Sequence, residues 1–184
     1  MQGAIYTAFS DMIIEQMGME QWNELIEQTK PLSQGIYTSG EQYQDSELIN
    51  MVQALSVKTG IEIEPLIEQF GRYLFKKLYE TSPVDISKID SLQSFLLAID
   101  GLIHVEVKRL HPNAYLPTFE YETVDENTLI MYYSSKRKLW HVSIGLIFGA
   151  AEQFNEKISI KHPECMHQGA ARCKLVISFE GHNE

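Results

Sequence analysis

The chain has 184 residues, 44% of them hydrophobic, which is the size and composition of one globular domain with a sizeable core. Fifteen Lys and Arg against twenty-five Asp and Glu give a net charge of −10, which argues against nucleic acid and anionic membranes as partners. The sequence has no signal-peptide pattern at its N-terminus and no apolar run long enough to span a membrane, so we expect a cytoplasmic protein.

Apolar side chains at helical spacing predict that the first part of the chain is helical. Pro31 and the Ser-, Gly- and Gln-rich stretch to Asp45 predict a loop, which Ser46 ends as a candidate N-cap. Gly60 and Pro83 predict helix ends, and a short helical turn is expected at 86–90. The expected helices cover about 4–17, 20–29, 46–59, 62–80 and 91–110.

After Pro112 the pattern changes to strands, with a hairpin turn at 125–127. The order of helices first and strands later predicts an α+β fold with a mainly antiparallel sheet of about four strands. We expect one domain over 1–184, with a helical N-terminal lobe at about 1–60 and a second lobe at about 61–184. The expected strands are 118–124, 128–134, 157–161 and 172–179, with a helix at about 139–154.

Tyr133, Ser135 and Arg137 place three hydrogen-bond donors at alternate positions near the end of an expected strand. In a strand these three side chains would share one face. A guanidinium flanked by two hydroxyls suits a carboxylate ligand. On these residues alone, the alternative is a strand end with a solvated arginine.

Other segments around this triplet carry a family resemblance. Leu102-Ile103-His104-Val105 and Leu116-Pro117 lie upstream, and Gly145-Leu146-Ile147-Phe148-Gly149 lies downstream. In this order and spacing, and with the opening Met1-Gln2-Gly3-Ala4-Ile5, the chain resembles the haem-nitric oxide/oxygen-binding (H-NOX) family, which includes the sensor domain of soluble guanylate cyclases. The resemblance covers essentially the whole chain and implies a bacterial, stand-alone haem sensor.

His104 lies in line with Gly101 and Leu97 on the helix expected at 91–110, where the glycine leaves room for a flat ligand. Taken alone, a histidine on an apolar helix is usually a hydrogen-bonded core residue. The resemblance implies that His104 is the axial ligand of haem b. It also implies that the propionates are bound by Tyr133, Ser135 and Arg137.

The resemblance implies that the other haem face is lined by hydrocarbon alone. Oxygen-binding members of the family place a tyrosine where this chain has Val142, so NO and CO are the expected ligands and a stable oxygen complex is not. Pro117 is expected to start the first strand and, by resemblance, to press on the porphyrin. The expected lining residues, for which an ordinary core is the alternative, are Ile5, Phe9, Leu74, Leu78, Val142 and Leu146.

His162, Cys165, His167 and Cys173 supply two imidazoles and two thiols within twelve residues. Such a set suits tetrahedral zinc, and similarity to bacterial family members with a comparable tail supports this. Two free thiols or one disulfide are the alternatives. The remaining histidines, expected on the surface, are His111, His141 and His182.

The residues allow three functions, and no motif predicts an enzyme. The first is an NO sensor: NO on ferrous haem breaks the bond from iron to His104, frees the 91–110 helix, and lets the porphyrin relax against Pro117. Because the chain ends soon after its last strand, it is expected to act in trans, and the resemblance suggests a histidine kinase or a cyclic-di-GMP enzyme as partner. The second is a redox-sensing interaction module that uses Cys165 and Cys173. The third is a haem peroxidase, which the apolar distal residues disfavour.

Overall fold

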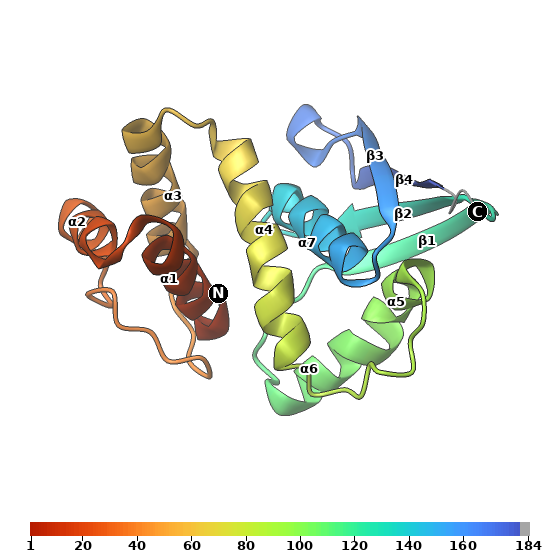
Figure 1. The fold of residues 1–184 in the computed structure, drawn as a ribbon, viewed down its shortest axis with the longest axis horizontal. Coiled ribbons are helices and arrows are strands. Elements are labelled where there is room, and N and C mark those ends of the chain that lie inside the picture. Colours follow the sequence, from red (N-terminus) through yellow and green to blue (C-terminus); the bar gives the residue numbers. More distant parts are fainter. Residues whose placement is uncertain (181–184) are drawn as a thin grey trace.

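The structure, a computed structural model, describes residues 1–180 and is built around one long helix, α4 (Figure 1). Helices α1 to α3 lie on one side of α4, and the sheet with the later helices lies on the other (Figure 1). None of the described helices has the length and hydropathy needed to cross a membrane. The first four helices are α1 (Gly3–Met17), α2 (Met19–Thr29), α3 (Asp45–Thr59) and α4 (Ile63–Glu80).

The second half of the chain forms a four-stranded sheet with helices packed against it. Its strands are all antiparallel to their neighbours, in the order β1-β2-β4-β3. The predicted α+β fold with a four-stranded antiparallel sheet is therefore confirmed. The elements are α5 (Leu92–Ala98), the π-helix η1 (Ile99–Ile103), α6 (His104–Leu110), β1 (Thr118–Asp125), β2 (Thr128–Ser134), α7 (Trp140–Gln153), β3 (Lys157–Glu164), the 3-10 helix η2 (Met166–Gln168) and β4 (Cys173–Glu180).

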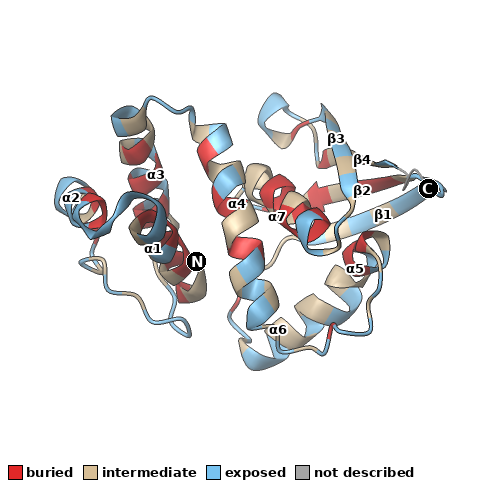
Figure 2. Cartoon of the chain, viewed as in Figure 1, coloured by how far each residue is buried: buried red, intermediate tan, exposed pale blue. Residues whose placement is uncertain are grey.

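Two large hydrophobic clusters and a small third one, made of Tyr133, Cys165 and Cys173, form the core. The first joins α1, α2, α3 and the N-terminal part of α4, and the second joins α5, α7 and the central strands β2 and β4. Side chains of β4 alternate in burial, β2 buries the three consecutive residues 129–131, and the helices bury their inward stripes (Figure 2). The division into lobes at about residue 60 stays a prediction.

Helices α4 and α7 touch backbone to backbone. A Cβ on Gly71 would lie 2.6 Å from the Val142 carbonyl oxygen, and a Cβ on Gly145 would lie 2.8 Å from Cα of Gly71. Only glycine fits at such separations. The two glycines therefore bring α7, which carries Val142 and Leu146, against the helix that carries Leu74.

The helix predicted at 91–110 runs without a break from Leu92 to Leu110, but it is not α-helical throughout. Ser91 caps α5 by accepting a hydrogen bond from the Ser94 N–H, but the helix then widens into a π turn, in which the His104 N–H bonds to the Ile99 carbonyl. The apolar stripe continues through both helices, so periodicity alone does not reveal the extra residue in the turn. Such π turns are rare and often lie at functional sites.

Three smaller predictions also differ from the structure. Residues 86–90 form a hydrogen-bonded turn rather than a helical one. Helix α3 begins at Asp45, so Ser46 is not its N-cap. Strand β3 continues to Glu164, past a register irregularity that begins at Lys161.

Candidate functional site

His104 begins α6, directly after the π turn, and its side chain is only 19% exposed. Its Nδ1 lies 2.7 Å from Oδ1 of Asp100, and its ring stacks on Phe119 with 5.7 Å between centroids. Burial lowers the pKa of His104, although Asp100 acts in the opposite direction, so the neutral imidazole is favoured. Because a carboxylate accepts the Nδ1 proton, Nε2 carries the lone pair, and no described residue hydrogen-bonds to it.

The six residues expected to line the distal face come from α1, α4 and α7. Phe9 and Leu74 are each 1% exposed in the first core cluster, and three others pack against that cluster. Leu78, one turn further along α4, is 39% exposed. The three that pack against the cluster are Ile5, Val142 and Leu146.

The expected alignment of Tyr133, Ser135 and Arg137 on one strand face is wrong in part, because β2 ends at Ser134. The Tyr133 hydroxyl oxygen accepts from the Leu139 N–H at 3.0 Å, and the Ser135 hydroxyl oxygen accepts from the Arg137 N–H at 3.2 Å. Each hydroxyl therefore keeps its own proton for a further acceptor.

Arg137 reaches across to the first group of helices. Its Nε donates to Asp45 Oδ2 at 2.5 Å, and its Nη1 donates to the Tyr115 carbonyl at 3.0 Å. Asp45 also lies 2.8 Å from the N-terminal ammonium of Met1. Burial alone would raise the pKa of Asp45, but the bonds from Arg137 and the N-terminus outweigh it and lower that pKa. A guanidinium has five N–H donors, so Arg137 retains donors for an anion.

These residues fit a haem. A neutral, carboxylate-held imidazole offers a free nitrogen, three helices supply a hydrocarbon wall, and Arg137 with two hydroxyls supplies donors for carboxylates. Pro117 lies one residue before β1 and is half-buried.

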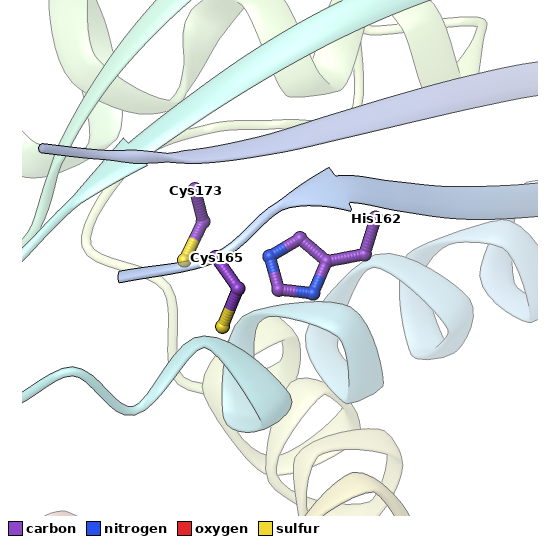
Figure 3. Close-up of side chains that lie close together, drawn as sticks. All are labelled: His162, Cys165 and Cys173. Carbon is purple, nitrogen blue, oxygen red and sulfur yellow. The ribbon is translucent and has the colours of Figure 1, made fainter. Parts of the chain in front are cut away.

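A second cluster lies where β3 and β4 begin to separate, and Figure 3 shows its three side chains converging. One ligand atom each from His162, Cys165 and Cys173 lies within 4.8 Å of the others. Tetrahedral zinc with Zn–S of about 2.3 Å and Zn–N of about 2.0 Å holds such atoms roughly 3.5–3.8 Å apart, so closure requires shifts of about 1 Å. Nε2 of His162 is buried without a partner among the described residues.

The surroundings of this cluster act on its ligands in different directions. Burial raises the pKa of the Cys173 thiol, which opposes the thiolate that a metal needs, whereas the Met166 N–H, which donates to its sulfur at 3.3 Å, favours the thiolate. Burial lowers the pKa of His162, so its imidazole is neutral and able to coordinate. The fourth predicted ligand, His167, is exposed on η2 and lies outside the converging group.

The other histidines are spread over the chain. His141 stacks on Trp140 with 3.4 Å between ring centroids and is half-buried rather than on the surface. His111 is half-buried at the end of α6, and His182 lies outside the described residues.

The fold and the residues around His104 fit a haem-binding domain, and comparison with known proteins identifies its class. A sequence model of the haem-NO-binding family matches residues 2–162. The chain therefore belongs to this family, the H-NOX domains, which are haem-based gas sensors related to the soluble guanylate cyclases. The match ends at His162, so the two cysteines lie beyond it.

Individual relatives support the assignment. The H-NOX protein of S. oneidensis, solved in its Fe(II)NO state, is 35% identical with a TM-score of 0.92, covering 98% of this chain and 100% of that one. The unliganded Fe(II) H-NOX protein of K. algicida is 30% identical with a TM-score of 0.90, covering 100% and 99%. Soluble guanylate cyclase gcy-35 of Caenorhabditis elegans is 25% identical over 141 residues, 74% of this chain and 20% of the cyclase, so the chain spans about a fifth of that relative.

Sequence reasoning missed two residues of the site. Asp100 could have been found, because a carboxylate four residues before a candidate ligand lies on the same helical face. Asp45 could not, because nothing local links it to Arg137, which is 92 residues away.

Proposed function

We propose that this protein is a haem-based sensor of nitric oxide with His104 as the axial ligand. The observation that carries the proposal is the carboxylate-held imidazole of His104, and it is supported by the hydrocarbon side chains that α1, α4 and α7 contribute to the first core cluster. The haem iron supplies a coordination position for a diatomic gas. An apolar wall favours NO and CO over oxygen, because bound oxygen becomes partly negative and needs a hydrogen-bond donor.

Each remaining site residue has a role in this proposal. Tyr133, Ser135 and Arg137 bind the propionates through their free donors. Pro117 contacts the porphyrin from the start of β1. Loss of the bond from His104 to iron on NO binding would release both α6 and the contact at Pro117. The wall is formed by Ile5, Phe9, Leu74, Leu78, Val142 and Leu146.

An absorption spectrum of the purified, reduced protein with and without NO tests the proposal. We expect a five-coordinate ferrous haem b that becomes a five-coordinate NO complex. A colourless protein, or an NO complex that keeps the bond to His104, contradicts it.

We further propose that the output is passed, in the cytoplasm of a bacterium, to a histidine kinase or a cyclic-di-GMP enzyme in trans. H-NOX domains are sensor domains rather than catalytic ones, which supports an output activity outside this domain. Adding the NO-bound and NO-free protein to each purified candidate enzyme tests this. The proposal requires that one enzyme activity respond to NO only when this protein is present.

A second candidate site is zinc at His162, Cys165 and Cys173, completed by His167. The convergence of three ligand atoms and the unpartnered Nε2 of His162 favour it. In this alternative the protein is a thiol redox module, because oxidised cysteines release zinc and the β3–β4 hairpin rearranges. Metal analysis under reducing conditions tests the site, and Cys165→Ala separates the functions. If output responds to NO in Cys165→Ala, the haem is the sensor.

A further inference from the structure

Asp100 makes two hydrogen bonds through its two different oxygens. Oδ1 lies 2.7 Å from Nδ1 of His104, and Oδ2 accepts from the backbone N–H of Phe119, also at 2.7 Å. Asp100 itself lies within the π turn, His104 begins α6, and Phe119 belongs to β1. One carboxylate therefore joins the turn, the helix and the edge strand of the sheet.

We propose that Asp100 is a positioning residue for the sensor bond. It fixes the proton of His104 on Nδ1, increases the electron density that Nε2 gives to iron, and transmits movement of the histidine to β1. The inference rests on the proposed role of His104 as axial ligand. Carboxylates that accept the second N–H of a ligating histidine orient its ring and raise its basicity.

The geometry distinguishes Asp100 from an ordinary ion pair on a helix surface. In an exposed pair four residues apart, both side chains rotate freely and contribute little. Here the bond to the Phe119 N–H fixes the carboxylate, and only 31% of the Asp100 side chain is exposed. The His104 ring in turn lies against the ring of Phe119.

Phe119 thus contacts the histidine in two ways, through its own ring and through Asp100. If His104 is displaced, its ring leaves Phe119. Its Nδ1 then pulls on the Asp100 carboxylate, which is bonded to the second residue of β1. Pro117 lies two residues before Phe119, so the same movement reaches the proline. The π turn supplies the joint, since its widened backbone places both Asp100 and His104 beside β1.

The test uses the haem-loaded ferrous protein and the variant Asp100→Asn. Asparagine keeps the size of the side chain, but it is neutral, and its amide nitrogen cannot accept from the Phe119 N–H. We expect the iron–histidine stretching frequency, measured by resonance Raman spectroscopy without a gas ligand, to fall. In the CO-bound protein, we expect NMR to show that the His104 Nδ1–H or the Phe119 amide loses protection from solvent exchange, because asparagine offers one acceptor oxygen to the two N–H groups.

Glu106→Gln is the matched control. Glu106 lies in the first turn of the same helix, but it pairs with Arg109 at 2.8 Å instead of with the histidine. Its loss removes the same charge and should leave the stretching frequency and both exchange rates unchanged. An equal shift in both variants would mean a general effect of charge and would overturn the inference.

Two further outcomes are decisive. An unchanged stretching frequency in Asp100→Asn overturns the positioning role. If that variant does not fold, the wild-type protein decides, because fast solvent exchange at both the His104 Nδ1–H and the Phe119 amide rules out the two bonds. The sensor proposal fails separately, if the wild-type NO complex keeps its bond to His104, and the comparison in the NO-free and CO-bound states still tests Asp100.

Discussion

The two histidine sites differ in how far the chain itself completes them. At His104, one ring nitrogen is already held by Asp100 and the other is free. At His162, the buried Nε2 has no partner among the described residues and points at two thiols. A buried polar group without a partner costs about 1–3 kcal/mol, so the second site gains most from an ion.

This difference suggests different uses. A ligand whose second nitrogen is held by a carboxylate passes its movement to that carboxylate when its bond to a metal breaks, which suits a bond that must open and close. A cluster that needs a cation to satisfy its own atoms suits a permanent structural metal. Variants at each of the two sites test this contrast.

The largest effect is expected at His104. In His104→Gly, the iron–histidine stretching band should be lost completely, and added imidazole should restore it, because the fold retains the cavity left by the ring. The helix-propensity cost of Gly at the start of α6 is about 1 kcal/mol, which is small beside the roughly 5–15 kcal/mol of a folded domain, so the protein should stay folded. Resonance Raman spectroscopy with and without imidazole measures the result.

His111→Gly, at the other end of α6, is the control and should keep the band. If the band survives in His104→Gly, another residue binds the iron and the contrast between the two sites disappears.

At the second site, Cys173→Ala should remove zinc. Cys173 is fully buried and belongs to the converging group, so its loss takes both a ligand and the cation. Each 1 kcal/mol of lost stability lowers the melting temperature of a chain of this length by roughly 2–4 °C, and we expect a fall of roughly 4 °C or more. Metal analysis and thermal denaturation, with and without a chelator, measure the two effects.

His167→Ala refines this test, because His167 is exposed and lies outside the converging group. Water can replace its ligand atom, so zinc should be retained with lower affinity. Zinc-free wild-type protein with two freely titratable thiols would exclude the site altogether.

The sequence predicts the residues of the second site from a local motif, whereas parts of the His104 site depend on contacts that no local pattern shows. His162, Cys165 and Cys173 lie within twelve residues on one hairpin, so a local motif brings them together. The same motif also included His167, but η2 turns that side chain toward solvent. The sequence predicts helices and strands well wherever apolar side chains repeat at a regular period, because the buried face of each element sets both that period and the type of secondary structure.

The features that the sequence does not predict are departures of the backbone from regular helix or strand geometry and contacts between residues far apart in the chain. The π turn before His104 leaves the apolar stripe unbroken, so it gives no periodic signal. The end of β2 at Ser134 turns Arg137 away from the sheet and toward Asp45. Both features lie at the site, where local rules are most often broken.

A third effect, of intermediate size, concerns gas selectivity on the distal side. The wild-type ferrous protein should form no stable oxygen complex in air, because the distal wall has no hydrogen-bond donor. A charge-assisted bond of about 1.5–3 kcal/mol would change oxygen affinity roughly ten- to a hundredfold. Absorption spectra after mixing with air check this, and a long-lived oxygen complex would mean that a donor reaches the gas.

The smallest effect is expected at Asp45, which holds Arg137 as Asp100 holds His104, but across the two groups of helices. The pKa of Asp45 lies below its ordinary value of 3.8, so the stabilisation is present above that pH and is lost as the pH falls through the lowered pKa. Because 34% of the Asp45 side chain is exposed, solvent screens the pair, and Asp45→Asn should cost only about 0–1 kcal/mol. Denaturant unfolding at pH 7 and at pH 3 tests the sign: the difference in unfolding free energy between wild type and Asp45→Asn should shrink at the lower pH and at high salt.

Haem affinity gives a sharper test of the contact between Asp45 and Arg137. If Arg137 binds a propionate, freeing it from Asp45 should leave haem affinity equal or higher, while Arg137→Gln should lower it. A fall in haem affinity in Asp45→Asn at pH 7 would mean that Asp45 positions Arg137, as Asp100 positions His104. Asp45 would then not compete with a propionate for the arginine.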